Sequence, residues 1–482
     1  MLKKRNTKKH ADKLTQNLND TNGNYSQMVL SPEEVEYLVY NLTNPDLCEE
    51  SAQKLINYFS NFPYIYEPKY IKVLFEFYRE ENQQSDEVIS LISEILISLF
   101  RYNKQNVSVL EVMKNENFYS LIWIYIDHIP SVMVLYKWLI KTFDCVFEYA
   151  MRNDICSKLS IIIYPESENT PILFELISSF ARYTNYYSKF KHLIDAVSEM
   201  TFCTINLEVF INGITCIGEF TKRSIDFSIQ ICQNDKFFQF CSKLDQGRIF
   251  TFKAIVEFLD KTLQNRQICQ ESQNSKCGIE GLLNLLSIQD YNYRLQFEQC
   301  IYNIIKAAAK VIEQVQSKNC DESFLMPAVK AFSFLIYGPE IVKFYISSNI
   351  HYFLFEIAKN GNVAFEINVE VFRAICNLVS SSNLNEAKIL IDMGFLSLAE
   401  DQIEMMIKLP NTTIDALIRI IDFSESYEEA KEWKTLIFEN ETIFSQLQFI
   451  IDHPDAVDED NYCRDFNESA SYLIQKRPNS SD

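Results

Sequence analysis

The chain has 482 residues and is 47% hydrophobic, enough for about two to four ordinary domains or for one elongated repeat array. Its formal net charge of −20 disfavours a nucleic-acid partner, because affinity for phosphates needs a basic surface. Only 9 Gly and 12 Pro occur, and strand-rich folds with many tight turns need more of both, so the composition favours helices joined by short turns.

The first segment, residues 1–30, is predicted to be a basic and largely disordered arm with a polar linker. Its basic cluster, in an otherwise acidic chain, consists of Lys3, Lys4, Arg5, Lys8 and Lys9. Three interpretations stay open: a nuclear-localisation peptide, a segment that binds another transport factor, or a solubilising tail. The positive charge would also allow the arm to lie on the acidic body of the chain.

Helical signals begin directly after this arm. Ser31-Pro32-Glu33-Glu34 has the pattern of a capping box with Pro at the first helical position, which predicts a helix start. From there, an apolar pair that is followed four residues later by another apolar residue recurs along the chain. The candidate anchors of this pattern are Leu55, Leu96, Leu139, Leu176, Ile214, Ile255, Ile304, Phe332, Ile375 and Leu417.

Most of these anchors are separated by roughly 40 residues, the period of armadillo and HEAT repeats. Ile304 fits poorly, because Ile255 and Phe332 are 77 residues apart, close to two units. The segment 270–278 is predicted to be a loop between repeats. The pattern predicts about ten stacked helical units over residues 31–450, each burying faces that its neighbours cannot cover alone.

The unit is clearest over residues 367–399. There Val371, Ala374, Ile375 and Leu378 share one helical face, and Gly394 is expected to form a left-handed turn before the next helix. At the corresponding step of other units, we expect residues that tolerate this turn nearly as well, namely Asn117, Asp235, Asn349 and Asn440. Residues 451–482 are predicted to form an acidic loop, a short capping helix at 466–475 and a tail.

The segment EESAQKLINY, residues 49–58, resembles the third helix of an armadillo repeat, with Glu49, Glu50, Ala52, Leu55 and Asn57 at matching positions. The resemblance implies an all-α, right-handed α-solenoid of about ten armadillo/HEAT-like repeats. Together with the basic arm and the polar linker, it is similar to importin-alpha. In that family the arm binds importin-beta, and Trp and Asn ladders in the concave groove bind basic peptide segments.

The resemblance places a two-residue polar step on each third helix, because positions four apart lie one above the other. It implies a peptide-binding groove that includes Gln53, Asn57, Arg373 and Asn377. An Asn side chain can both donate and accept a hydrogen bond, so it can hold an extended peptide backbone. A purely structural role for the two Asn residues, bonding a neighbouring loop, stays open. The other steps are Glu94/Ser98, Lys137/Lys141, Lys253/Glu257, Lys330/Phe334 and Asp415/Arg419.

Motifs that would indicate catalysis, a metal or a cofactor are missing from the sequence. The five histidines are far apart, and no H-E-x-x-H, G-x-S-x-G or P-loop pattern occurs. Thirteen cysteines without a C-x-x-C pair indicate a reducing compartment, cytoplasmic or nuclear, and thiols that act as small core residues. The most apolar region, 118–143, is interrupted by charged residues and Pro, so no membrane span is predicted.

We therefore predict a non-enzymatic, protein-binding adaptor of armadillo type, similar to an importin-alpha nuclear import receptor. Its partners would be other proteins, including importin-beta and basic peptide segments, rather than nucleic acid, a membrane or a small-molecule substrate. The main alternative is a scaffold or regulatory subunit with the same fold and a partner unrelated to nuclear transport. An enzyme is the remote third hypothesis.

Overall fold

The computed structural model describes most of the chain, and every regular element in the described part is a helix. The basic arm with Lys3 to Lys9 and most of the predicted loops 270–278 and 452–465 lie outside the described residues. The described ranges are 30–61, 68–79, 84–102, 118–164, 166–244, 249–265, 268, 278–318, 321–360, 363–402, 408–452 and 466–476. No helix within these ranges is long and apolar enough to cross a lipid bilayer.

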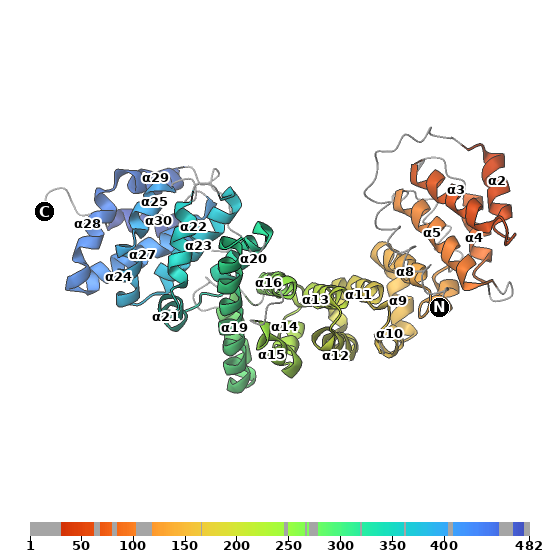
Figure 1. The fold of residues 1–482 in the computed structure, drawn as a ribbon, viewed down its shortest axis with the longest axis horizontal. Helices are drawn as coiled ribbons and strands as arrows, with labels where there is room; N and C mark the ends of the chain where they lie inside the picture. The colour runs from red at the N-terminus through yellow and green to blue at the C-terminus, as the bar shows by residue number, and fades with distance from the viewer. Residues whose placement is uncertain are drawn as a thin grey trace. The chain divides into compact units, whose positions relative to one another are not determined.

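The chain forms two compact units, Met1–Tyr149 and Ala150–Asp482. In the first unit, α3, α5 and α8 pack side by side in chain order (Figure 1). Their anchors Leu55, Leu96 and Leu139 are buried in the layer between these helices and the remaining ones. The helices are α2 (Pro32–Asn41), α3 (Cys48–Asn61), α4 (Pro68–Glu76), α5 (Asp86–Tyr102), α7 (Phe118–Leu121), η2 (Ile122–Tyr125), α8 (Pro130–Thr142) and α9 (Asp144–Arg152), which crosses the boundary between the two units.

The first helices of the second unit form repeats of about three helices each. Within it, α11 packs against α13 and α13 against α16, while the intervening helices form an outer layer. The helices are α10 (Ile155–Ile163), α11 (Thr170–Ser178), η3 (Ser179–Tyr186), α12 (Tyr187–Cys203), α13 (Leu207–Thr221), α14 (Ile225–Cys232), α15 (Asp235–Cys241) and α16 (Ile249–Leu263).

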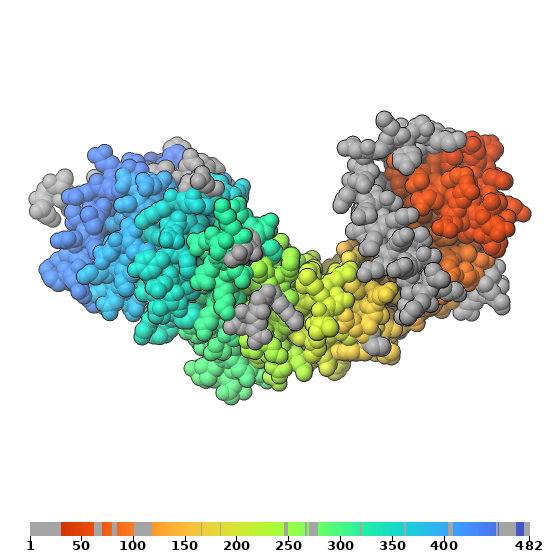
Figure 2. All heavy atoms as spheres, in the orientation of Figure 1, coloured from red at the N-terminus to blue at the C-terminus, as the bar shows by residue number. Residues whose placement is uncertain are grey.

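The rest of the second unit extends the same stack, with α16 packed on α20, α20 on α23 and α23 on α27. Figure 2 shows the atoms of neighbouring helices of this unit in continuous contact. The helices are α18 (Gly278–Gln289), α19 (Tyr291–Gln316), η5 (Glu322–Phe324), α20 (Leu325–Phe334), α21 (Pro339–Ser347), α22 (Ile350–Lys359), α23 (Phe365–Ser381), α24 (Leu384–Asp392), α25 (Phe395–Asp401), α27 (Pro410–Ser426), η6 (Glu428–Ala430), α28 (Lys431–Glu439), α29 (Glu441–Asp452) and α30 (Phe466–Gln475).

All ten predicted anchors are buried, and nine of them lie on the helices that stack in series. Ile304 lies instead on α19, the 26-residue helix that packs beside α18 and α20. Because α16 contacts α20 directly, the 77 residues between Ile255 and Phe332 form one enlarged repeat with a long second helix. The poor fit of Ile304 to the repeat period thus reflects an irregular repeat.

Helix ends follow the sequence only in part. The predicted capping box is present, since Ser31 N donates to Glu34 Oε2 at 2.7 Å and Glu34 N donates to Ser31 Oγ at 3.2 Å. Gly394 and Asn349 adopt the left-handed conformation as predicted, with φ of 98° and 59°. Asp235 and Asn440 do not.

The two failed positions have a common cause. Asn234 caps α15 from an extended conformation, so Asp235 is already helical, and Asn440 is extended too, with its side chain accepting from Ile443 N at 3.0 Å. Asn therefore acts here as an N-cap, the alternative use of a short polar side chain. Asp154 takes the left-handed conformation that the sequence did not predict there, and Asn117 lies outside the described residues.

The architecture is an all-α solenoid built from armadillo-like, mostly three-helix repeats. Seven of the nine described cysteines are buried without a disulfide, as expected for small core residues, while Cys145 is half-buried and Cys203 is exposed. The short helix expected at 466–475 is present as α30, and it packs on α27 and α29 at the end of the second unit.

Candidate peptide-binding face

The helices that stack in series, α3, α5 and α8 in the first unit and α11, α13, α16, α20, α23 and α27 in the second, bury one face and leave the other to solvent. We call the solvent side the polar face. Its side chains are mostly polar or charged, and those on adjacent helices lie within reach of one another. The predicted two-residue steps all lie on it.

The step on α3 is open. Gln53 and Asn57 are both exposed, and Gln53 Nε2 donates to Asn57 Oδ1 at 3.3 Å. Within the described part of the chain, the amide nitrogen of Asn57 has no hydrogen-bond partner. A donor of this kind is available to a ligand. The same pairing recurs on α19, where Gln299 Nε2 donates to Asn303 Oδ1 at 3.3 Å, so the pair alone does not mark a site.

The step on α23 is closed. Asn377 Nδ2 donates to Ser333 O of α20 at 2.7 Å, and Arg373 Nε is 3.5 Å from Glu370 Oε2. Ser333 O belongs to the last turn of α20, where carbonyls have no partner within the helix. The structural role that the sequence left open for Asn377 is therefore present, and it occupies the group that a peptide would use.

Two further helices are joined in the same way. Asn265 Nδ2 donates at 2.9 Å to Thr221 O at the end of α13, and Arg419 binds Ser382 O at the end of α23 through Nε at 3.2 Å and Nη2 at 2.9 Å. In each case a polar side chain on or just after the next stacked helix donates to a carbonyl at the end of the preceding one, and Thr221 O also accepts from Ser228 Oγ at 3.1 Å. These contacts join neighbouring repeats, because a buried carbonyl without a donor is costly.

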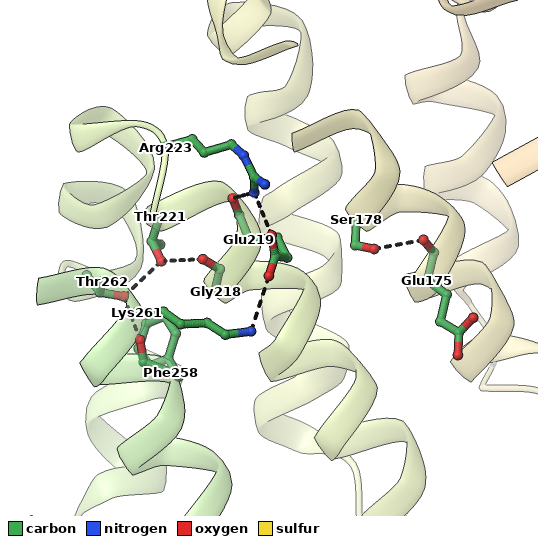
Figure 3. A network of polar contacts seen from close by, with 9 residues as sticks. All are labelled: Glu175, Ser178, Gly218, Glu219, Thr221, Arg223, Phe258, Lys261 and Thr262. Carbon is green, nitrogen blue, oxygen red and sulfur yellow. Dashed lines mark hydrogen bonds and ion pairs between the residues drawn. The ribbon is translucent and has the colours of Figure 1, made fainter. Parts of the chain in front are cut away.

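A charged network crosses the polar face between α13 and α16 (Figure 3). Glu219 accepts from Arg223 Nη1 at 2.5 Å on its own helix and from Lys261 Nζ at 3.2 Å on the next. Beneath it, the hydroxyls of Thr221 and Thr262 are 2.8 Å apart and buried. Burial opposes ionisation of Glu219, but the two cations outweigh it and lower its pKa below the ordinary 4.5. Glu219 is thus an anion at neutral pH.

The network continues along the second unit. Lys330 Nζ of α20 lies 3.6 Å from Asp260 Oδ2 of α16, and Ser333 Oγ donates to Glu370 Oε2 of α23 at 3.0 Å. Cations and carboxylates on adjacent helices therefore neutralise one another over much of this face. Sequence reasoning missed Glu219, Asp260 and Lys261. The 42-residue spacing of Glu219 and Lys261, one repeat apart at facing positions, was the available signal.

The polar face offers polar and charged groups that could bind a ligand. In the described part of the chain, no cluster of three or more His, Cys, Asp or Glu could hold a metal ion. The titratable groups with the largest pKa shifts are buried Tyr and Cys side chains, such as Tyr136 and Cys241, whose pKa values are raised chiefly by burial in the core.

Comparison with known proteins supports the fold but assigns no family. No model of a known protein family matches the chain, and no curated protein matches its sequence. The structure is similar to an engineered protein solved by the Northeast Structural Genomics Consortium, with a TM-score of 0.54 at 14% identity over 92% of this chain and 98% of that one. A designed armadillo repeat protein matches 54% of this chain and 97% of its own, with a TM-score of 0.36 at 12% identity.

Proposed function

We propose that this protein is a non-enzymatic adaptor that binds a segment of another protein on the polar face of its stacked helices. The observation that supports this most directly is the open step on α3, where Gln53 and Asn57 present amide groups to solvent. Repeat arrays expose long surfaces of this kind, and protein binding is their usual role. Amide side chains suit the backbone of an extended peptide, which offers a donor and an acceptor at nearly every residue.

The finer proposal is an importin-alpha-like nuclear import receptor, active in the cytoplasm and nucleus. It rests on the basic cluster of the arm and on the α3 step. In that case the arm residues Lys3, Lys4, Arg5, Lys8 and Lys9 would bind importin-beta, and the face around Gln53 and Asn57 would bind a basic peptide.

A scaffold or regulatory subunit with an unrelated partner is the second candidate, and the closed step on α23 favours it. On α23, Asn377 Nδ2 already donates to Ser333 O. On the neighbouring helices, Lys261 and Lys330 are paired with the carboxylates that a basic peptide would need. The second unit is therefore less suited to such a cargo than the first.

The test is a titration of a fluorescein-labelled basic peptide with two lysine-rich clusters, followed by anisotropy. We expect the double variant Gln53→Ala, Asn57→Ala to bind at least about fivefold more weakly than the wild type, because each lost amide bond contributes about 0.5–1.5 kcal/mol. The matched control is Gln299→Ala, Asn303→Ala, which removes the same pair from α19 and should leave binding unchanged.

Two results would contradict the proposal for this site: equal losses in both double variants, or no binding by the wild type. The transport role is tested separately, by capture of importin-beta with the full chain and with residues 1–14 deleted. We expect recovery from the full chain only. Equal recovery from both, or recovery from neither, would leave the scaffold as the better description.

A further inference from the structure

Large apolar side chains are exposed at the N-terminal ends of successive stacked helices in the second unit. Ile205, just before α13, is 91% exposed, Phe250 in the first turn of α16 is 58% exposed, and Phe365 at the start of α23 is 43% exposed. Leu207 and Ile211 of α13 are also exposed. Such residues occur singly on any protein surface, so their value depends on whether they lie together.

Contacts further along α13 and α16 place the exposed residues at the start of α13 level with Phe250 at the start of α16. Glu219 contacts Lys261 and Thr221 contacts Thr262, so α13 and α16 run parallel with an offset of 41 to 42 residues. By that offset, Phe250 is level with the first turn of α13, beside Leu207. On its other side, the Phe250 ring packs edge-on against Phe324, with centroids 5.2 Å apart.

The same argument extends the row to α23. Ser333 contacts both Glu370 and Asn377, which gives α20 and α23 an offset of 37 to 44 residues. Phe324, which directly precedes α20, is thus level with Phe365. The five exposed residues Ile205, Leu207, Ile211, Phe250 and Phe365, with the buried ring of Phe324 between the last two, form a row that we call the N-terminal strip.

The charges beside this strip are mainly negative. Glu208, Glu257, Glu322 and Glu366 are all exposed and lie within two turns of its residues. Among the residues that the structure describes, Lys253 is the cation nearest to Phe250 in sequence, and its Nζ lies 3.9 Å from Glu257 Oε1. An apolar row flanked by carboxylates complements a segment that is apolar on one side and basic on the others.

The spacing of the strip fits a helix. Packed helices lie about 8–10 Å apart, so the exposed groups of α13 and α16 are separated by about one such interval and those of α16 and α23 by about two. On a helical ligand, residues seven apart are separated by about 10.5 Å on one face. From this match, together with the charge, we propose that the N-terminal strip docks a basic amphipathic helix of a partner protein, about 20 residues long, with an apolar residue every heptad.

This site differs from the α3 step in unit, ligand conformation and chemistry, so it can bind whether or not the proposed function holds. The probe is a labelled 21-residue peptide of three identical heptads, with Leu at two positions of each and Lys and Ala elsewhere. It is titrated with the full chain and followed by anisotropy. We expect saturable binding that weakens between 50 and 300 mM salt, because the flanking carboxylates are exposed.

Two variants locate the site. Phe250→Ser with Phe365→Ser removes two half-exposed rings, and we expect binding at least about tenfold weaker. Tyr352→Ser with Tyr427→Ser is the matched control, since it removes two comparably exposed rings elsewhere in the unit, and it should bind as the wild type does. Circular dichroism melting of each variant verifies that it is folded.

A second variant changes charge without removing any apolar contact. Glu208→Lys with Glu366→Lys should weaken binding of the Lys peptide and strengthen binding of a peptide with Glu in place of Lys. The proposal fails if the wild type does not bind the Lys peptide. It also fails if the Phe and Tyr double variants bind equally, or if the charge variant leaves the preference between the two peptides unchanged.

Discussion

Mutation of the two Asn residues at corresponding positions of α3 and α23 is predicted to have different effects on local stability. Asn377→Ala removes the 2.7 Å bond from Nδ2 to Ser333 O and leaves that carbonyl without this donor at the junction of two repeats. Asn57→Ala removes an exposed side chain whose bond is to Gln53 on the same helix. The first change should therefore destabilise a repeat junction, and the second should not.

The expected magnitudes differ clearly. Loss of one partner of a buried hydrogen bond costs about 1–3 kcal/mol, whereas exposed substitutions usually stay within about 0.5 kcal/mol. If the junction between α20 and α23 opens locally, 1–3 kcal/mol corresponds to roughly 5- to 150-fold faster amide exchange. Asn377→Asp is a stricter variant, because it keeps the shape of the side chain but cannot donate through Oδ when ionised.

The assay is hydrogen–deuterium exchange with mass spectrometry, which resolves peptides from α20 and α23 separately. A local measurement is needed because repeat arrays open by segments rather than as one cooperative unit. We expect faster exchange at the end of α20 in both Asn377 variants and unchanged exchange throughout in Asn57→Ala. Normal protection of α20 in Asn377→Ala would refute the structural role assigned to Asn377.

Three other predictions follow from the second unit. Gly213→Ala should destabilise it by about 1–3 kcal/mol in urea unfolding, because the new Cβ would collide with Thr201 Oγ1 and lie 3.0 Å from Phe174 Cε2; adding Thr201→Ala should recover part of the loss. Burial lowers the pKa of His351, so the unfolded chain binds a proton more readily, and thermal stability should fall as pH drops below about 6.5; His351→Gln should reduce that fall. Iodoacetamide should modify exposed Cys203 in the native protein and spare Cys376, whose pKa is raised by burial, and equal labelling by peptide mass spectrometry would contradict this.

Local features of the chain could be predicted because they depend on near neighbours in sequence. The capping box at Ser31 and Glu34, the left-handed Gly394 and the buried face of α23 each arise within one or two helical turns. Asp235 and Asn440 were assigned the wrong turn because Asn and Asp serve equally well as N-caps and in left-handed turns. Composition cannot choose between these uses, since both satisfy the same backbone groups.

The candidate site was less accessible to sequence reasoning. The pattern of positions four apart treated all of the two-residue steps as equivalent. Whether a polar side chain is available depends on the carbonyl or charge that the adjacent repeat places beside it, as with Asn377 and Ser333 or Lys261 and Glu219. Those partners are about 40 residues away, and small changes in repeat length decide whether they meet.

The sequence by itself determined that the chain is helical, that its helices repeat at about 40 residues, and that the anchors of the repeat are buried. Apolar residues at helical spacing form one face of a helix, and burial of that face is favourable. Only the tertiary structure decided that α19 belongs to one enlarged repeat, that the α3 step is open while the α23 step is closed, and that exposed apolar residues lie at the starts of α13, α16 and α23. Each of these depends on how neighbouring helices are offset, which is set by side-chain packing between repeats rather than by any pattern within one.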